Sequence, residues 1–151
     1  MENLTEEKVC HLAMSPLYVL YLVASEYLAP EKITQRHIVR AMEYGLAGHT
    51  PFSEAIFELL RSNLHEFYAE LSAESSDEFQ EKLRAELSSV TQILGQLSGP
   101  QAMIEDFKTA LKNLAVFVAG GGVFRKDIQN AGMQARAAWI SALLDGACPS
   151  M

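Results

Sequence analysis

The sequence predicts an all-α single domain, residues 1–151, folded as a bundle of six or seven helices. Apolar residues recur at helical spacing along most of the chain, and the period-two alternation of β-branched residues that marks a strand is missing. Residues that favour helix starts, such as Thr5, Thr34 and Thr50, divide the chain at intervals typical of helices. With 49% apolar residues among 151, the chain can bury one continuous core.

Two helices are predicted at the N-terminal end. Thr5 begins a short one that ends near Met14. Ser15 followed by proline then reads as the cap and first position of a second helix, Pro16–Tyr27. Because this helix is apolar on every side over Leu17–Ala24, we expect it to be the buried centre of the bundle.

Two more helices are predicted before the middle of the chain. Thr34 begins the third, and Gly45 loosens its end. Thr50 followed by proline begins the fourth. That helix carries a single apolar stripe from Phe52 to Leu71 with charged residues on the other side, which is the pattern of an amphipathic surface helix.

The second half of the chain predicts three helices. Ser75 caps the fifth, which ends before Pro100. The sixth has apolar residues at alternating steps of three and four, the spacing of a seam between helices, and ends at Gly120. The last helix is predicted from about Arg125 to Leu144.

A weak internal repeat relates the two halves. At an offset of 95, Val23–Ser25 aligns with Val118–Gly120, and apolar positions further along also coincide. Two interpretations stay open, a duplicated helical hairpin and the coincidental periodicity that any two hairpins share.

Charge and cysteine content exclude several classes of function. The formal net charge is −7 and the 12 basic residues are scattered, which argues against a nucleic-acid or anionic-membrane surface. The longest apolar run, Pro16–Ala24, is too short to span a bilayer. Cys10 and Cys148 have neither disulfide-framework nor zinc-site spacing. With an acidic rather than basic N-terminus, these features lead us to expect a cytoplasmic location.

The familiar catalytic and metal motifs are missing from the sequence. Its histidines do not show the spacing of a zinc-protease, di-iron or haem site, and no GxSxG element is present. Glu54 and Glu58, like Glu66 and Glu70, lie one helical turn apart, but such pairs are more typical of a solvated helix face than of a metal site. No cofactor and no metal site are predicted.

Tyrosines and histidines are the strongest candidates for a ligand pocket. Buried tyrosines need hydrogen-bond partners, and several on neighbouring helices would line an apolar pocket with polar tips. The alternative is a core layer of phenols with satisfied hydrogen bonds. The candidate pocket residues are Tyr18, Tyr21, Tyr44, His37 and His65, with Tyr27 also considered.

A glycine run before two cations is a candidate anion site. Gly121 and Gly122, followed by Arg125 and Lys126 and a new helix, could form a nest of backbone N–H groups beside two positive charges. A flexible turn between two helices explains the same glycines.

Two segments resemble the hairpins of the TerB-like tellurite-resistance family: Leu20–Ser25 (LYLVAS) and Leu114–Gly120 (LAVFVAG). In that family of small helical domains, a helix ending in such a segment turns into a second helix, and an acidic cluster after the turn is thought to bind a divalent ion. The turns of this chain read EYLAPE at 26–31 and GGVFRKD at 121–127. They lack the acidic spacing of that cluster, so the resemblance implies the fold and a bacterial stress-response setting but no ion site.

The leading functional hypothesis is a non-catalytic helical module that associates with a protein or holds a small ligand. A protein partner, a homodimer and a small apolar ligand are the alternatives left open. The other class of function is an enzyme whose unrecognised active site lies in a pocket lined by tyrosine and histidine.

Overall fold

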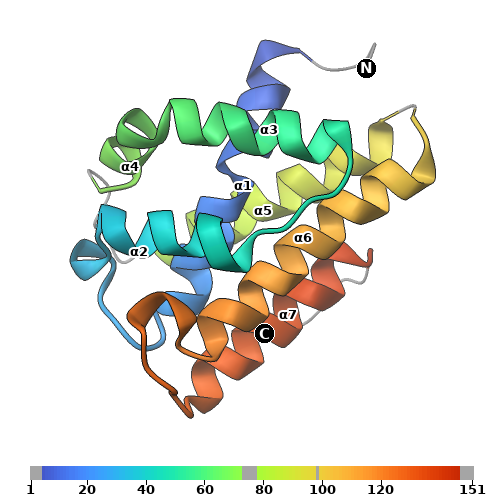
Figure 1. Cartoon of the computed structure of the whole chain (residues 1–151). Coiled ribbons are helices and arrows are strands. Elements are labelled where there is room, and N and C mark those ends of the chain that lie inside the picture. Colours follow the sequence, from blue (N-terminus) through green and yellow to red (C-terminus); the bar gives the residue numbers. More distant parts are fainter. Residues whose placement is uncertain (1–4, 73–77, 98, 147–151) are drawn as a thin grey trace.

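Helices make up all the regular structure of the described residues, which are 5–72, 78–97 and 99–146 of the computed structural model (Figure 1). The all-α prediction is confirmed. The helices are α1 (Glu6–Ala24), α2 (Gln35–Arg40), α3 (Pro51–Ser62), α4 (Leu64–Ser72), α5 (Phe79–Gln96), α6 (Gln101–Ala119) and α7 (Ala131–Leu144). Short turns are η1 (Pro30–Lys32), the π-helical η2 (Ala41–Gly45) and η3 (Gly122–Phe124).

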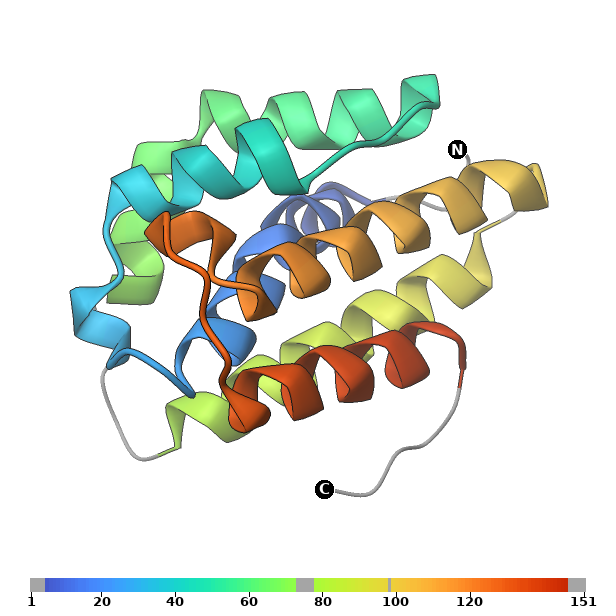
Figure 2. The same cartoon turned by 60° about the horizontal axis from the view of Figure 1, so that its bottom comes forward.

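Helix α1 is the centre of the fold. It contacts α3, α5, α6 and α7, and Figure 2 shows it enclosed by the other helices. Every residue from Leu12 to Ala24 is buried, and Leu20 and Val23 are 1% and 0% exposed. The expectation of a central apolar helix is therefore confirmed, because only burial on all sides suits a helix with no polar face.

The predicted break near Met14 is wrong, since α1 continues through Pro16. A proline inside a helix leaves the carbonyl four residues earlier without its N–H partner. That carbonyl belongs to Leu12, and the Ser15 hydroxyl donates a hydrogen bond to it at 2.6 Å. The serine expected to cap a new helix instead repairs the existing one.

The predicted fourth helix is in fact two, α3 and α4, which meet at Asn63. The backbone of Asn63 leaves the helical region, with φ −119° and ψ 19°. Its side-chain amide donates to the carbonyl of Leu59 at 2.9 Å, a local bond by which asparagine competes with the helix ladder.

Helix α7 begins six residues later than predicted. Arg125 has a left-handed backbone with φ 57°, which stops a helix from starting there. Asn130 is the actual cap, and its side-chain oxygen accepts the N–H of Met133 at 2.9 Å. Ser75, the predicted cap of the fifth helix, lies outside the described residues.

The two segments of the internal repeat share a local pattern but pack differently. Each of α1 and α6 ends in Val-Ala and is followed by a short 3₁₀ turn and a capped helix. Helix α6 packs along α7, whereas α2 packs mainly against η2 and η3. No helix among the described residues has the length and apolar character needed to cross a bilayer.

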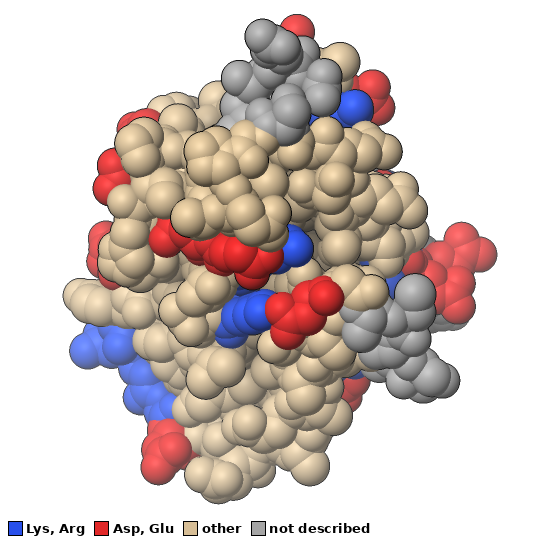
Figure 3. Space-filling model, turned by 90° about the vertical axis from the view of Figure 1, so that its right-hand side faces the viewer, with Lys and Arg blue, Asp and Glu red and all other residues tan. Residues whose placement is uncertain are grey.

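Charged side chains on one face gather in a band. In Figure 3, acidic and basic groups lie next to one another across this face, between large uncharged areas. Ion pairs of this kind join Lys108 to Glu105 and Lys112 to Asp145. The carboxylates of these pairs are 49% and 55% exposed, so water screens the pairs and they contribute little to stability.

Candidate functional site

A groove between α1, α4 and α5 encloses a cavity of about 370 Å³. We call it the α1–α4–α5 groove. Its volume is within the range of small-molecule sites. Its principal lining residues are His11, Met14 and Tyr18 from α1, Phe67, Glu70 and Leu71 from α4, and Phe79, Leu83 and Glu86 from α5.

Helical periodicity explains why these side chains face one another. His11, Met14 and Tyr18 are spaced three and four residues apart, which places them along one side of α1. Phe79, Leu83 and Glu86 are spaced four and three apart on α5 in the same way. Because α1 and α5 pack together, the two rows meet along the groove.

The polar part of the groove is centred on Glu86. Its Oε2 atom lies 2.5 Å from His11 Nε2 and accepts a longer hydrogen bond, 3.4 Å, from the Tyr18 hydroxyl. Burial, followed by the negative charges of Glu86 and Glu70, raises the pKa of the Tyr18 phenol well above its ordinary value. The phenol is neutral at physiological pH at its ordinary pKa of 10.0, and the shift makes it still harder to ionise. Cys10 is an exposed free thiol that also lines the groove.

A second concave surface lies between α2, η2 and η3, with a volume of about 630 Å³. We call it the α2–η3 surface. Arg40 donates from Nε to the carbonyl of Gly122 at 2.6 Å, and its guanidinium lies 4.9 Å from the ring centre of Tyr44. Tyr44 is 65% exposed and Val39 is 40% exposed. This surface also includes Arg36 and Arg125, so it is basic and apolar on a chain with net negative charge.

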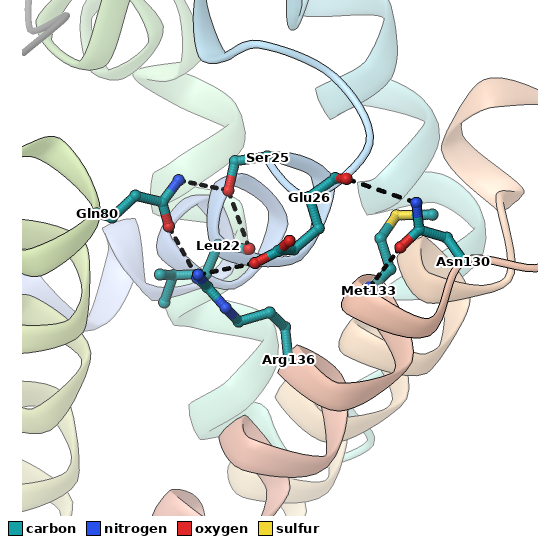
Figure 4. Close-up of polar contacts among 7 residues, drawn as sticks. All are labelled: Leu22, Ser25, Glu26, Gln80, Asn130, Met133 and Arg136. Carbon is teal, nitrogen blue, oxygen red and sulfur yellow. Dashed lines mark hydrogen bonds and ion pairs between the residues drawn. The ribbon is translucent and has the colours of Figure 1, made fainter. Parts of the chain in front are cut away.

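A polar cluster around the buried guanidinium of Arg136 joins the residues that follow α1 to α5 and α7 (Figure 4). Arg136 donates to Glu26 and to the side-chain oxygen of Gln80, both at 2.8 Å. The amide of Gln80 donates to the Ser25 hydroxyl, which in turn donates to the carbonyl of Leu22. We call Ser25, Glu26, Gln80 and Arg136 the closed cluster, because its members bond to one another.

Asp106 on α6 caps the start of α3. Its carboxylate accepts hydrogen bonds from the Ser53 hydroxyl at 2.7 Å, the backbone N–H of His49 at 3.0 Å, and the backbone and hydroxyl of Thr50. Burial alone would raise the pKa of this carboxyl, but the hydrogen bonds outweigh it and hold the pKa below the ordinary value. All of these partners are internal, so this carboxylate is structural.

The residues predicted to share one pocket lie in different places. Tyr18 lines the α1–α4–α5 groove, while His37 and Tyr44 line the α2–η3 surface. Tyr21 is 1% exposed in the core, against the edge of the Phe79 ring. His65 is exposed and bonds to Gln35. Tyr27, also considered, is 40% exposed and packs on Phe124.

The glycine run forms a compact turn rather than an open nest. Gly121 has φ 87°, which glycine adopts readily. The backbone N–H groups of Phe124 and Lys126 donate to the carbonyl of Gly121, and that of Arg125 to the carbonyl of Gly122. These donors are therefore used within the turn. Arg125 contributes its side chain to the α2–η3 surface.

Several groove residues were not singled out from the sequence, namely Glu86, Phe67 and Phe79. The sequence did contain one signal: His11, Met14 and Tyr18 are spaced so that they share one side of a helix. The partner of that row lies 75 residues away, from His11 to Glu86. Periodicity cannot reveal which distant helix faces it.

Comparison with known proteins gives no relative from which a role could be transferred. No protein-family model, no curated protein and no solved structure matched the chain. Within the part of the chain that the structure describes, no group of three or more histidine, cysteine, aspartate or glutamate side chains is placed to hold a metal ion.

Proposed function

We propose that this domain is a non-catalytic module that binds a small ligand in the α1–α4–α5 groove. The observation that carries the proposal is a cavity whose apolar walls include Phe67 and Phe79 and whose polar groups include the His11–Glu86 pair. Binding sites combine a mostly apolar lining with a few placed polar groups in this way.

The geometry favours binding over the alternative of an enzyme. The Tyr18 phenol is protonated at physiological pH even at its ordinary pKa of 10.0, and burial raises the pKa further, so this group suits hydrogen-bond donation better than proton abstraction. His11 contacts the carboxylate of Glu86, as the histidine of a catalytic pair would. The same carboxylate oxygen also accepts a hydrogen bond from Tyr18. No nucleophile is hydrogen-bonded to His11 within the described residues.

Methyl NMR tests the proposal with an internal control. Met14 lines the groove, whereas Met133 is fully buried on α7 and is not among the groove residues. With methionine methyl groups labelled, titration of 1-octanol should shift the Met14 signal saturably and leave Met133 in place. An unmoved Met14, or equal shifts of both signals, would contradict a ligand site in the groove.

A second candidate function, self-association, is favoured by the α2–η3 surface. Its exposed Tyr44 and Val39 are apolar, and its arginines complement the acidic surface expected of a chain with net charge −7. Tyr27 continues the apolar area through its contact with Phe124.

Sedimentation velocity over a hundredfold range of concentration separates this candidate from ligand binding. A dimer that dissociates on dilution and is abolished by Tyr44→Ser would support it. A monomer at every concentration would rule out self-association while leaving the groove proposal intact.

For the biological setting, we propose a bacterial stress response, supported by the resemblance of Leu20–Ser25 and Leu114–Gly120 to TerB-like hairpins. The test is bacterial growth in tellurite with and without expression of the protein. Equal growth would remove this setting and leave the binding proposal unaffected.

A further inference from the structure

We infer that the ligand of the α1–α4–α5 groove is an organic cation, an ammonium group attached to an apolar body. The inference rests on the proposed function and names the chemical class of ligand. It is carried by the excess of carboxylates in the groove and by its aromatic walls.

Negative charge in the groove exceeds positive charge. Three carboxylates line it, those of Glu7, Glu70 and Glu86, against two basic groups, His11 and Lys82. Within the described residues, Glu7 and Glu70 form no ion pair. The carboxylates therefore outnumber the basic groups even when His11 is protonated.

Glu86 keeps acceptor capacity for a ligand. Its contacts with His11 and Tyr18 both involve Oε2. Oε1 accepts no hydrogen bond among the described residues, and the side chain is 29% exposed. A carboxylate has about four acceptor positions, so an ammonium group can bind Oε1 without displacing His11.

The walls suit the rest of such a ligand. Phe67, Phe79 and Tyr18 bring aromatic rings to the groove, and aromatic faces attract cations as well as apolar groups. Met14 and Leu83 are 7% and 1% exposed and give apolar contacts to an alkyl body. The raised pKa of Tyr18, caused by burial and then by Glu86 and Glu70, is consistent with a negative potential here.

A matched set of eight-carbon probes tests the charge preference. Octylamine, 1-octanol and octanoate share the alkyl chain, and at pH 7 they are cationic, neutral and anionic. From saturation of the Met14 methyl shift at low salt, we expect octylamine to bind about tenfold more tightly than octanol, and octanoate more weakly than both.

Variants on one helix show where the preference arises. Glu86→Gln should reduce the affinity for octylamine about five- to tenfold and change that for octanol by a much smaller factor, because only octylamine carries a charge. Glu81→Gln is the matched control, because Glu81 is exposed on the same helix and does not line the groove. Glu70→Gln should also reduce the affinity for octylamine. Because Glu70 is exposed, this variant tests the inference even if Glu86→Gln does not fold.

The outcomes separate the two proposals. Saturable octanol binding at Met14 with no gain for octylamine, or tighter binding of octanoate, would overturn the cation preference and leave the groove as a ligand site. No response of Met14 to any of the three probes would overturn both. Equal losses in Glu81→Gln and Glu86→Gln would place the preference in the overall charge of the protein, contradicting the inference.

Discussion

Two polar clusters connect the N-terminal segment to α5, one along α1 at His11 and Tyr18 and the other just after α1 at Ser25 and Glu26, and they differ in how completely their polar groups are used. In the closed cluster, Arg136 lies between Glu26 and Gln80 with its side chain 10% exposed. The other cluster, around Glu86, borders a cavity, and one oxygen of its carboxylate has no partner among the residues that the structure describes.

The difference indicates which cluster is structural. A buried charge whose hydrogen bonds are met internally fixes the helices around it and has little left to offer a ligand. The closed cluster is completed by α7, whereas no third helix supplies a charged partner to Glu86 within the described residues. We therefore assign stability to the first cluster and binding to the second.

The largest effect on the free energy of unfolding is expected for Leu20, which follows Tyr18 of one cluster and precedes Ser25 of the other on the chain. Leu20→Ala should lower the free energy of unfolding by about 2–5 kcal/mol, because it leaves a cavity at a side chain that is 1% exposed in the core. Val116→Ala, at a side chain that is 67% exposed, should change it by less than about 0.5 kcal/mol. Urea denaturation measures both, and a cost under about 1 kcal/mol at Leu20 would contradict a central α1.

Glu26→Gln should cost about 1–3 kcal/mol, since it leaves the buried guanidinium of Arg136 without its charged partner. Glu31→Gln is the control, an exposed glutamate a few residues away. The same denaturation experiment compares them. Equal stability of the two variants would mean that the closed cluster does not hold α7 on α1.

Asp106 is another carboxylate whose hydrogen bonds come from within the protein, so we expect it, like Glu26, to contribute to stability. Asp106→Asn should cost about 0.5–2 kcal/mol at pH 7, the range for loss of a helix cap. Because the folded-state pKa is lowered, this stabilisation is present above the ordinary value of 3.8 and is lost as pH falls through the lower folded pKa. The wild type and the variant should thus converge in acid, and a constant difference down to pH 2 would contradict the assignment.

The smallest effect on stability is expected at the open cluster. Glu86→Gln should cost less than about 1 kcal/mol, because the partner that loses the carboxylate, His11, is 27% exposed and can be hydrated, whereas Arg136 is only 10% exposed. A larger loss would show that this pair is structural as well.

Periodicity and capping residues predicted the helical class, the central helix and the C-terminal ends of α6 and α7. They failed where a side chain bonded the backbone locally. Ser15 supplies the donor that Pro16 lacks, and Asn63 divides a continuous apolar stripe into two helices. Both residue types have these alternative roles, and the sequence does not say which one the packing selects.

The candidate site was only partly predictable. Tyr18 was singled out for its chemistry, and its place in the groove follows from the side of α1 that it shares with His11. The importance of Glu86 depends on how α5 packs against α1, a long-range contact that no local spacing specifies. Tyr21 has the same residue type as Tyr18 and lies in the core, so residue type alone could not separate them.

The most direct test measures stability and octylamine affinity in the same two variants, Glu26→Gln and Glu86→Gln. We predict opposite outcomes: Glu26→Gln loses unfolding free energy and keeps the affinity of the wild type, and Glu86→Gln keeps stability and loses affinity. If Glu86→Gln were the less stable variant and bound octylamine as the wild type does, the assignment of binding to the open cluster would be wrong.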